Sequence, residues 1–301
     1  MRNALIVFAV VAAACGVSNE STVEQDDLND TLAEGAELSA TSRTFVGVRR
    51  DYRKCIAPLC GGYWVHDLNR VNLNEVYVSG LDFTGSNLSD EDQGRIAGGE
   101  EVVLRGKLGP KESTFNTRPF IVSEAYRGLP GKPLGTADAF VKIEEVNIQC
   151  FRAPCATLGA RRVNYTAQIL FHGLDLAAPT AGLVSGNWLD KRATEDGAIT
   201  SGTWVKQGEE KIFAATNVFF KLPEVAGPCP LFRPTNCADG QTWGYRRDAD
   251  RCVVPVSCVP QRFCAAVVPA CADGYTLTSW PSTNGGCPAY ACDPSWVVDA
   301  N

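Results

Sequence analysis

The chain has 301 residues, 45% of them hydrophobic, which is long enough for two or three domains that each bury a core. Its formal charge of −6 is concentrated in residues 16–42, which carry seven acidic side chains and no basic one. The rest of the body is therefore neutral, and no basic surface for nucleic acid is indicated.

Residues 1–14 have the pattern of a signal peptide. One positive charge precedes an apolar run of eleven residues, too short to cross ~30 Å of hydrocarbon as a helix. The run ends in Ala12-Ala13-Ala14-Cys15-Gly16, which resembles a bacterial lipobox, although Ala12 stands where lipoboxes more often carry leucine. The resemblance implies that Cys15 becomes a lipidated N-terminus, so that the lipid makes a membrane the first partner of this protein.

Gly16 is not the aspartate associated with retention at the inner membrane, so the resemblance implies the bacterial outer membrane or cell surface. The alternative is ordinary cleavage after Ala14, which would leave a soluble protein. In either case, residues 15–42 are expected to form a solvated acidic tether.

Two segments, residues 43–127 and 139–222, read as runs of short strands separated by turns. Residues 128–138 are rich in glycine and proline and predict the connection between them. One helix is expected near Ser89–Ile96, since Ser89 and Asp92 have the spacing of a capping box. We therefore predict a mainly β fold with two related antiparallel β units, each a sandwich or an OB-like barrel.

The two units match each other at offsets of 92 to 96 residues, which indicates a tandem duplication, with chance similarity of two strand-rich halves as the alternative. The matching positions are Phe45-Val46 with Phe140-Val141, Cys55 with Cys150, Val71-Asn72 with Val163-Asn164, Gly80-Leu81-Asp82 with Gly173-Leu174-Asp175, Gly106 with Gly202, and Phe120 with Phe213. The sequence leaves open whether the copies form separate domains or one joined sheet.

Each unit carries one C-x4-C loop that contains a proline: Cys55 to Cys60 in the first unit and Cys150 to Cys155 in the second. A turn that brings the two Cα atoms to ~5.5 Å allows a local disulfide, which an oxidising compartment favours. The alternative is that the four thiolates converge on one zinc ion, although C-x2-C spacing is the stronger zinc signal. Disulfides are the prediction, with no metal and no other cofactor.

The first loop continues into Gly61-Gly62-Tyr63-Trp64 and, with three segments further on, resembles a domain of unknown function found in secreted bacterial lipoproteins. Those segments are Leu68-Asn69-Arg70, Val103-Leu104-Arg105-Gly106 and Ser123-Glu124-Ala125-Tyr126-Arg127. The resemblance covers about residues 43–222 and implies export without implying an activity. Tyr63 and Trp64 make this loop a candidate binding surface.

Residues 223–301 form a cysteine-rich tail with two repeats, 229–258 and 264–292, that share a Cys-Ala-Asp-Gly motif. Each repeat has too little apolar content to hold a core without disulfides, and its four cysteines allow three pairings. The eight cysteines are Cys229, Cys237, Cys252, Cys258, Cys264, Cys271, Cys287 and Cys292. Aromatic residues that could form a binding surface here are Trp243, Tyr275 and Trp280.

The second tail repeat, with Cys271-Ala-Asp-Gly-Tyr275 and Cys287-Pro-Ala-Tyr-Ala-Cys292, resembles antistasin-type protease-inhibitor modules. The resemblance implies protease inhibition as an alternative function. Those modules carry further cysteines that this chain lacks, so their pairing and inhibitory loop cannot be transferred. The alternative to an inhibitor, and the one we favour, is that the tail is a rigid, protease-resistant surface module.

The chain has two histidines, His66 and His172, which rules out an H-E-x-x-H metalloprotease and limits any Ser-His-Asp triad to one of them. His66 is expected to face solvent from a strand. We therefore predict an exported, lipid-anchored cell-envelope protein with a non-enzymatic binding or structural role and a protein or envelope polymer as its ligand. An envelope hydrolase that uses either histidine is the second alternative.

Overall fold

The computed structural model describes residues 38–297, except residues 71–74, 113, 136–137, 147, 152, 225–227, 234, 265–266 and 284. The predicted signal peptide, Cys15 and most of the acidic tether lie outside the described residues. The described part is mainly β, with antiparallel sheets, two helices and a disulfide-rich C-terminal region, which confirms the predicted fold class. Neither of the helices described is long and apolar enough to cross a membrane.

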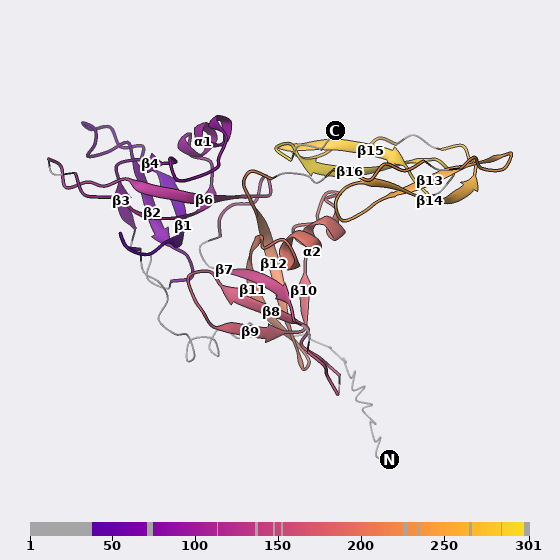
Figure 1. Cartoon of the computed structure of the whole chain (residues 1–301), viewed down its shortest axis with the longest axis horizontal. Coiled ribbons are helices and arrows are strands. Elements are labelled where there is room, and N and C mark those ends of the chain that lie inside the picture. Colours follow the sequence, from indigo (N-terminus) through magenta and orange to yellow (C-terminus); the bar gives the residue numbers. More distant parts are fainter. Residues whose placement is uncertain are drawn as a thin grey trace, which may run out of the picture.

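The first unit is a small barrel (Figure 1). Its elements are β1 (Thr44–Arg50), β2 (Tyr63–Asp67), β3 (Val76–Val78), β4 (Leu81–Asp82), α1 (Asp90–Ala97), β5 (Val102–Leu108) and β6 (Phe120–Gly128). The sheet order is β3-β2-β1-β5-β6, and β4 pairs in parallel with β6. Because only Ser79 and Gly80 separate β3 from β4, this bent strand joins the two edges of the sheet and closes it. The closed path corresponds to the OB-like barrel and not to a sandwich.

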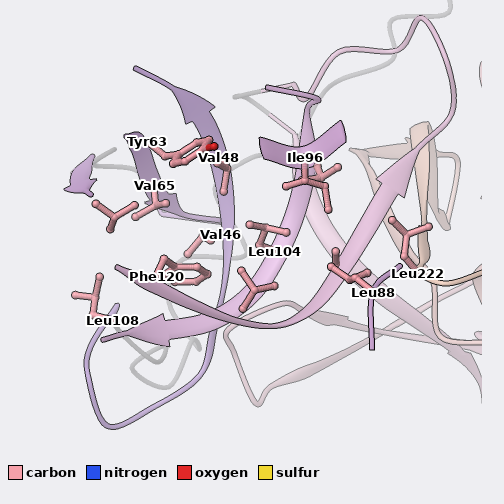
Figure 2. Packing of buried hydrophobic residues seen from close by; sticks show 14 residues of the cluster. Val46, Val48, Tyr63, Val65, Leu88, Ile96, Leu104, Leu108, Phe120 and Leu222 are labelled. Carbon is pink, nitrogen blue, oxygen red and sulfur yellow. The ribbon is translucent and has the colours of Figure 1, made fainter. Parts of the chain in front are cut away.

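The interior of this barrel is filled by side chains that alternate along the strands. Val46, Val65, Leu104 and Phe120 are fully buried and point at one another (Figure 2). Ile96 of α1 covers one end of this core (Figure 2). As predicted, α1 begins after Ser89, whose hydroxyl accepts a hydrogen bond from the backbone N–H of Asp92 (3.1 Å).

The second unit has the same topology. Its elements are β7 (Ala139–Glu145), β8 (Leu158–Arg162), β9 (Gln168–Phe171), β10 (Gly173–Asp175), α2 (Gly186–Thr194), β11 (Ile199–Gln207) and β12 (Glu210–Lys221). The sheet order is β9-β8-β7-β11-β12, and β10 pairs in parallel with β12. Its core contains Val141, Ile143, Phe171, Trp204 and Phe213. Each element of the first barrel thus has a counterpart here, which supports the tandem duplication.

The two barrels also share an irregularity. The pairing of β5 with β6 shifts by one residue at Gly106, and the pairing of β11 with β12 shifts at Gly202. At both positions a Cβ would collide with a backbone carbonyl of the neighbouring strand, that of Ile121 or Ala214. The bulges therefore require glycine, which explains why these two positions match in the sequence.

The barrels are joined edge to edge into one sheet of twelve strands. β6 and β12 pair antiparallel with Arg127 opposite Phe220, and these two residues occupy equivalent positions in their barrels. The pairing is therefore centred on a quasi-twofold axis. The apolar residues at the junction come in equivalent pairs: Phe45 with Phe140, Leu68 with Val163, Val103 with Ile199, and Tyr126 with Phe219. Such a self-complementary interface is what a C2 dimer has, here formed within one chain.

Two equivalent asparagines hold the barrels together across this axis. Asn69 accepts a hydrogen bond from the N–H of Phe140 (2.7 Å) and donates one to its carbonyl (2.8 Å). Asn164 makes the same two bonds with Phe45, at 2.6 and 2.8 Å. Both asparagines have positive φ angles, 65° and 72°, which asparagine tolerates better than most residues. The prediction that Val71-Asn72 is the counterpart of Val163-Asn164 is therefore wrong by three residues.

The tail forms two β-hairpins with identical disulfide pairing. Its strands are β13 (Gln241–Arg247), β14 (Val253–Pro260), β15 (Tyr275–Pro281) and β16 (Pro288–Pro294). The first cysteine of each repeat pairs with the third and the second with the fourth: Cys229–Cys252, Cys237–Cys258, Cys264–Cys287 and Cys271–Cys292. A buried ion pair joins the repeats, in which Arg247 donates to both carboxylate oxygens of Asp293 at 2.8 and 2.6 Å.

The tail packs against the junction of the barrels, near α2 (Figure 1). The ring centroids of Trp296 and Phe220 are 5.5 Å apart. The guanidinium carbon of Arg127 lies 5.6 Å from the centroid of the Trp296 ring. Arg127 is buried and pairs with Asp92 and Glu100 of the first unit, each at 3.0 Å. The tail is therefore an integral part of the fold and covers the quasi-twofold junction.

Candidate binding surface on the first cysteine loop

The first cysteine loop connects β1 to β2 and spans residues 51–62. Cys55 and Cys60 form a disulfide with their Cα atoms 5.7 Å apart, and Cys150 and Cys155 form the equivalent bond in the second barrel, at 6.0 Å. Each pair is closed within its own loop, which leaves no thiolate for a shared zinc ion. The zinc alternative is therefore wrong, and the predicted local disulfides are present.

A buried carboxylate fixes the start of the loop. Nε of Arg53 donates to both carboxylate oxygens of Asp51 (2.9 and 3.0 Å), and Nη2 of Arg53 donates to one of them (2.9 Å). Asp51 also accepts a hydrogen bond from the backbone N–H of Arg53 (3.1 Å). The hydrogen bond from the Arg53 side chain lowers the pKa of Asp51 to about 2. The loop thus starts with an ion pair between Asp51 and Arg53, and the carboxylate of Asp51 stays ionised at physiological pH.

Two aromatic side chains form a platform beneath the loop. Trp64 on β2 and Tyr77 on β3 are cross-strand partners and meet edge to face with ring centroids 5.4 Å apart. The Arg53 guanidinium lies over both, 5.1 Å from the Trp64 ring and 5.6 Å from the Tyr77 ring. The Tyr77 hydroxyl donates to the carbonyl of Pro58 (2.9 Å) and accepts from the N–H of Gly62 (3.2 Å). The platform therefore holds both ends of the disulfide loop.

Tyr63 does not share this surface. It points into the first barrel, is 8% exposed, and its hydroxyl donates to the carbonyl of Ala97 at 2.9 Å. Successive residues of a strand face opposite sides, and Val65 lies in the core beside Tyr63. The expectation that Tyr63 binds a ligand is corrected accordingly, and of the predicted pair Trp64 alone remains at the surface.

The loop presents apolar side chains to solvent. Tyr52 is 74% exposed, Ile56 80% and Leu59 50%. Basic residues stand between them in the chain, with Arg53 half-exposed and Lys54 exposed. The aromatic residues after the loop were predicted as a surface, but the apolar residues on it were not. Their signal in the sequence is Tyr52-Arg53-Lys54 directly before Cys55, followed by the apolar residues Ile56 and Leu59 between the two cysteines.

The second cysteine loop lacks the platform. Gly159 and Leu170 are the cross-strand partners that correspond to Trp64 and Tyr77. Ile148 occupies the position that corresponds to Arg53, 95 residues earlier. The two loops thus share a disulfide and a position in the barrel, but the arginine and the aromatic pair belong to the first barrel alone. Since the scaffold needs neither, we interpret the platform as a specialised feature.

A cleft of about 430 Å³ lies where the two barrels meet. Its charged residues are already paired with one another: Glu124 with Lys221 (3.1 Å), and Arg192 with Asp196 and Glu224 (each 2.6 Å). Burial raises the pKa of Glu224. Glu124 also pairs with Arg105 (3.3 Å), so three acids here are balanced by three bases, and the cleft has no excess of one charge that would select a ligand.

Neither histidine lines this cleft. His66 is half-buried with its Nδ1 atom enclosed, so the expectation that it faces solvent is wrong, and burial lowers its pKa. Nδ1 of His172 accepts a hydrogen bond from the backbone N–H of Lys211 (2.9 Å) at the bend between β9 and β10. The geometry gives the hydrolase alternative no support. Within the described residues, no three His, Cys, Asp or Glu side chains are grouped to hold a metal ion.

Comparisons with known proteins identify no activity. Residues 44–188 match a family described as a domain of unknown function (DUF6748). The match begins at the first residue of β1 and ends within α2, so it includes the whole first barrel and part of the second. An uncharacterized protein of Dictyostelium discoideum is 29% identical over 257 residues, covering 81% of this chain and 84% of that protein. No solved structure matches the chain.

Proposed function

We propose that this protein is exported to the cell envelope, anchored there through a lipid on Cys15, and binds an envelope component through the first cysteine loop without catalysis. The observation that carries this function is the loop itself, where an exposed apolar tip is held by Arg53 on the platform of Trp64 and Tyr77. The six disulfides are consistent with an oxidising compartment.

The first cysteine loop is preorganised for binding. Ordering a flexible loop on binding costs about 0.5–1.5 kcal/mol for each immobilised side chain. In this loop the disulfide, the ion pair between Asp51 and Arg53 and the hydrogen bonds of Tyr77 have already removed much of that freedom. A loop with the sole task of connecting β1 to β2 needs neither this rigidity nor exposed Ile56 and Leu59.

The test measures binding of the labelled chain from Gly16 to Asn301 to isolated cell envelopes. Starting at Gly16 removes the proposed lipid, so that any binding belongs to the folded body. We expect the variant Ile56→Ser/Leu59→Ser to lose most of the binding and Leu170→Ser to keep it. Leu170 is the matched control, because it is 46% exposed and lies far along the chain in the second barrel. Equal binding by both variants would contradict the proposed function.

A second candidate function is protease inhibition by the tail, which one observation favours. Residues 230–233 and 235–236 lie outside any strand between Cys229 and Cys237, which belong to the two disulfides of the first repeat; Leu231 is fully exposed and Phe232 half-exposed. A protease binds its substrates as extended strands, and disulfides at both ends would hold such a segment in place. A panel of serine, cysteine and metalloproteases tests this: inhibition that Leu231→Asp/Phe232→Asp abolishes supports it, and no inhibition in any class excludes it.

A further inference from the structure

We propose that the first cysteine loop docks on a lipid bilayer that carries anionic headgroups. This inference rests on the proposed function, because it takes the same loop as the binding surface and names its partner. Three properties of the loop carry it: an apolar tip, an excess of positive charge next to that tip, and a protruding position, since residues 52–57 are all exposed.

The apolar tip is formed by Tyr52, Ile56 and Leu59, all largely exposed. The disulfide between Cys55 and Cys60 closes the backbone that carries the last two into a small ring and so limits how far they can move. Apolar side chains held in water at a protruding position gain free energy when they enter the boundary between headgroups and acyl chains. Tyr52 suits this boundary because its ring is apolar and its hydroxyl is polar.

The charge of the loop matches an anionic surface. Residues 50–60 contain Arg50, Arg53 and Lys54 and a single acid, Asp51, which leaves an excess of two positive charges. Asp51 is buried and bound by Arg53, so the exposed charges of the loop are cationic. Long basic side chains can extend toward phosphate groups while their neighbours insert. The body as a whole is neutral, so the rest of it carries two net negative charges, which are spread over the other strands and the tail and do not concentrate beside the loop.

The shape of the loop distinguishes a bilayer from a polymer chain or a small ligand. A saccharide strand or a small molecule is normally bound in a concave site with polar groups that converge on it. The cleft at the barrel junction is a concave feature of this kind, and the loop does not line it. An apolar tip between cations on a protruding, rigid loop is instead suited to partial insertion into a planar surface.

The experiment is flotation of the chain from Gly16 to Asn301 with phosphatidylcholine vesicles, with and without phosphatidylglycerol. We expect binding to the vesicles that contain phosphatidylglycerol, reduced by salt. Ile56→Ser and Leu59→Ser should each weaken it about tenfold, since each removes a large part of one apolar side chain from the interface. Lys54→Gln should weaken binding to the anionic vesicles roughly fivefold and should not change the binding to vesicles of phosphatidylcholine alone. Leu170→Ser should bind as the wild type does.

Three results would overturn the inference: no binding to either vesicle, equal binding to both vesicles, or binding that Ile56→Ser and Leu59→Ser leave unchanged. Urea unfolding midpoints equal to that of the wild type establish that the variants are folded. If envelopes bind the chain through the loop but pure lipid vesicles do not, the lipid partner is wrong and the proposed function stands. If neither shows binding that depends on the loop, both fail.

Discussion

Replacing Asn164 with alanine should lower the free energy of unfolding by about 3 kcal/mol. The change removes the hydrogen bonds at 2.6 and 2.8 Å that Asn164 makes with the backbone of Phe45 across the quasi-twofold junction. A partly buried backbone group left without a partner costs about 1–3 kcal/mol. A non-glycine residue at the φ of 72° adds about 1 kcal/mol, because alanine lacks the local hydrogen bonds that help asparagine there. Asn69→Ala should have a similar effect, since Asn69 makes the same bonds with Phe140.

Two matched variants separate these contributions. Asn116 also has a positive φ, 53°, but it is exposed on the loop before β6, so Asn116→Ala should cost only the conformational part of about 1 kcal/mol. Asn164→Gly accepts the backbone conformation and loses only the hydrogen bonds, so it should cost about 2 kcal/mol. The assay is urea unfolding followed by tryptophan fluorescence, with linear extrapolation to water. If Asn164→Ala costs no more than Asn116→Ala, the asparagines do not hold the barrels together, and the reasoning is refuted.

Gly202→Ala should cost about 2–3 kcal/mol, because its Cβ would collide with a carbonyl of β12, whereas Gly80→Ala has open space and should be nearly neutral; equal costs would contradict the bulge argument. Asp293→Asn should cost about 3–5 kcal/mol in the same unfolding assay, because it leaves its arginine partner buried without a counter-charge; a cost below 1 kcal/mol would contradict this. The pKa of Asp51 is about 2 in the folded state, against its ordinary value of 3.8 in the unfolded chain, so its contribution to stability is complete above the unfolded value and is lost as the pH falls from there through 2. Asp51→Asn should abolish this part of the acid transition, and an unchanged profile would exclude Asp51 as its source. The oxidised chain from Gly16 should weigh about 12 Da less than the reduced one, two hydrogens for each of six disulfides, and a difference of about 8 Da would mean that two of them do not form.

The candidate site shows why residue patterns located the loop but not its chemistry. The spacing of Cys55 and Cys60 was enough to predict a local disulfide, since a proline turn within a sequence separation of five can bring the two Cα atoms together. The role of Arg53 was not predictable, because Trp64 and Tyr77 become neighbours only when β2 and β3 pair. Tyr63 and Trp64 face opposite sides of β2, and the register with β1 decides which of the two is buried.

The sequence alone determined the β character and the presence of disulfide-stapled repeats in the tail, and it indicated the duplication, because alternation, turn residues and cysteine spacing are local properties of the chain. Tertiary structure decided everything that depends on residues far apart. It closed each barrel through a bent strand, chose one of three cysteine pairings in each tail repeat, and joined the copies at Arg127 and Phe220. It also placed Asn69 next to Phe140, where the two residues form a hydrogen bond although they are 71 positions apart in the sequence. Such contacts form only when the strands adopt one register and pack together, and no short stretch of sequence contains that information.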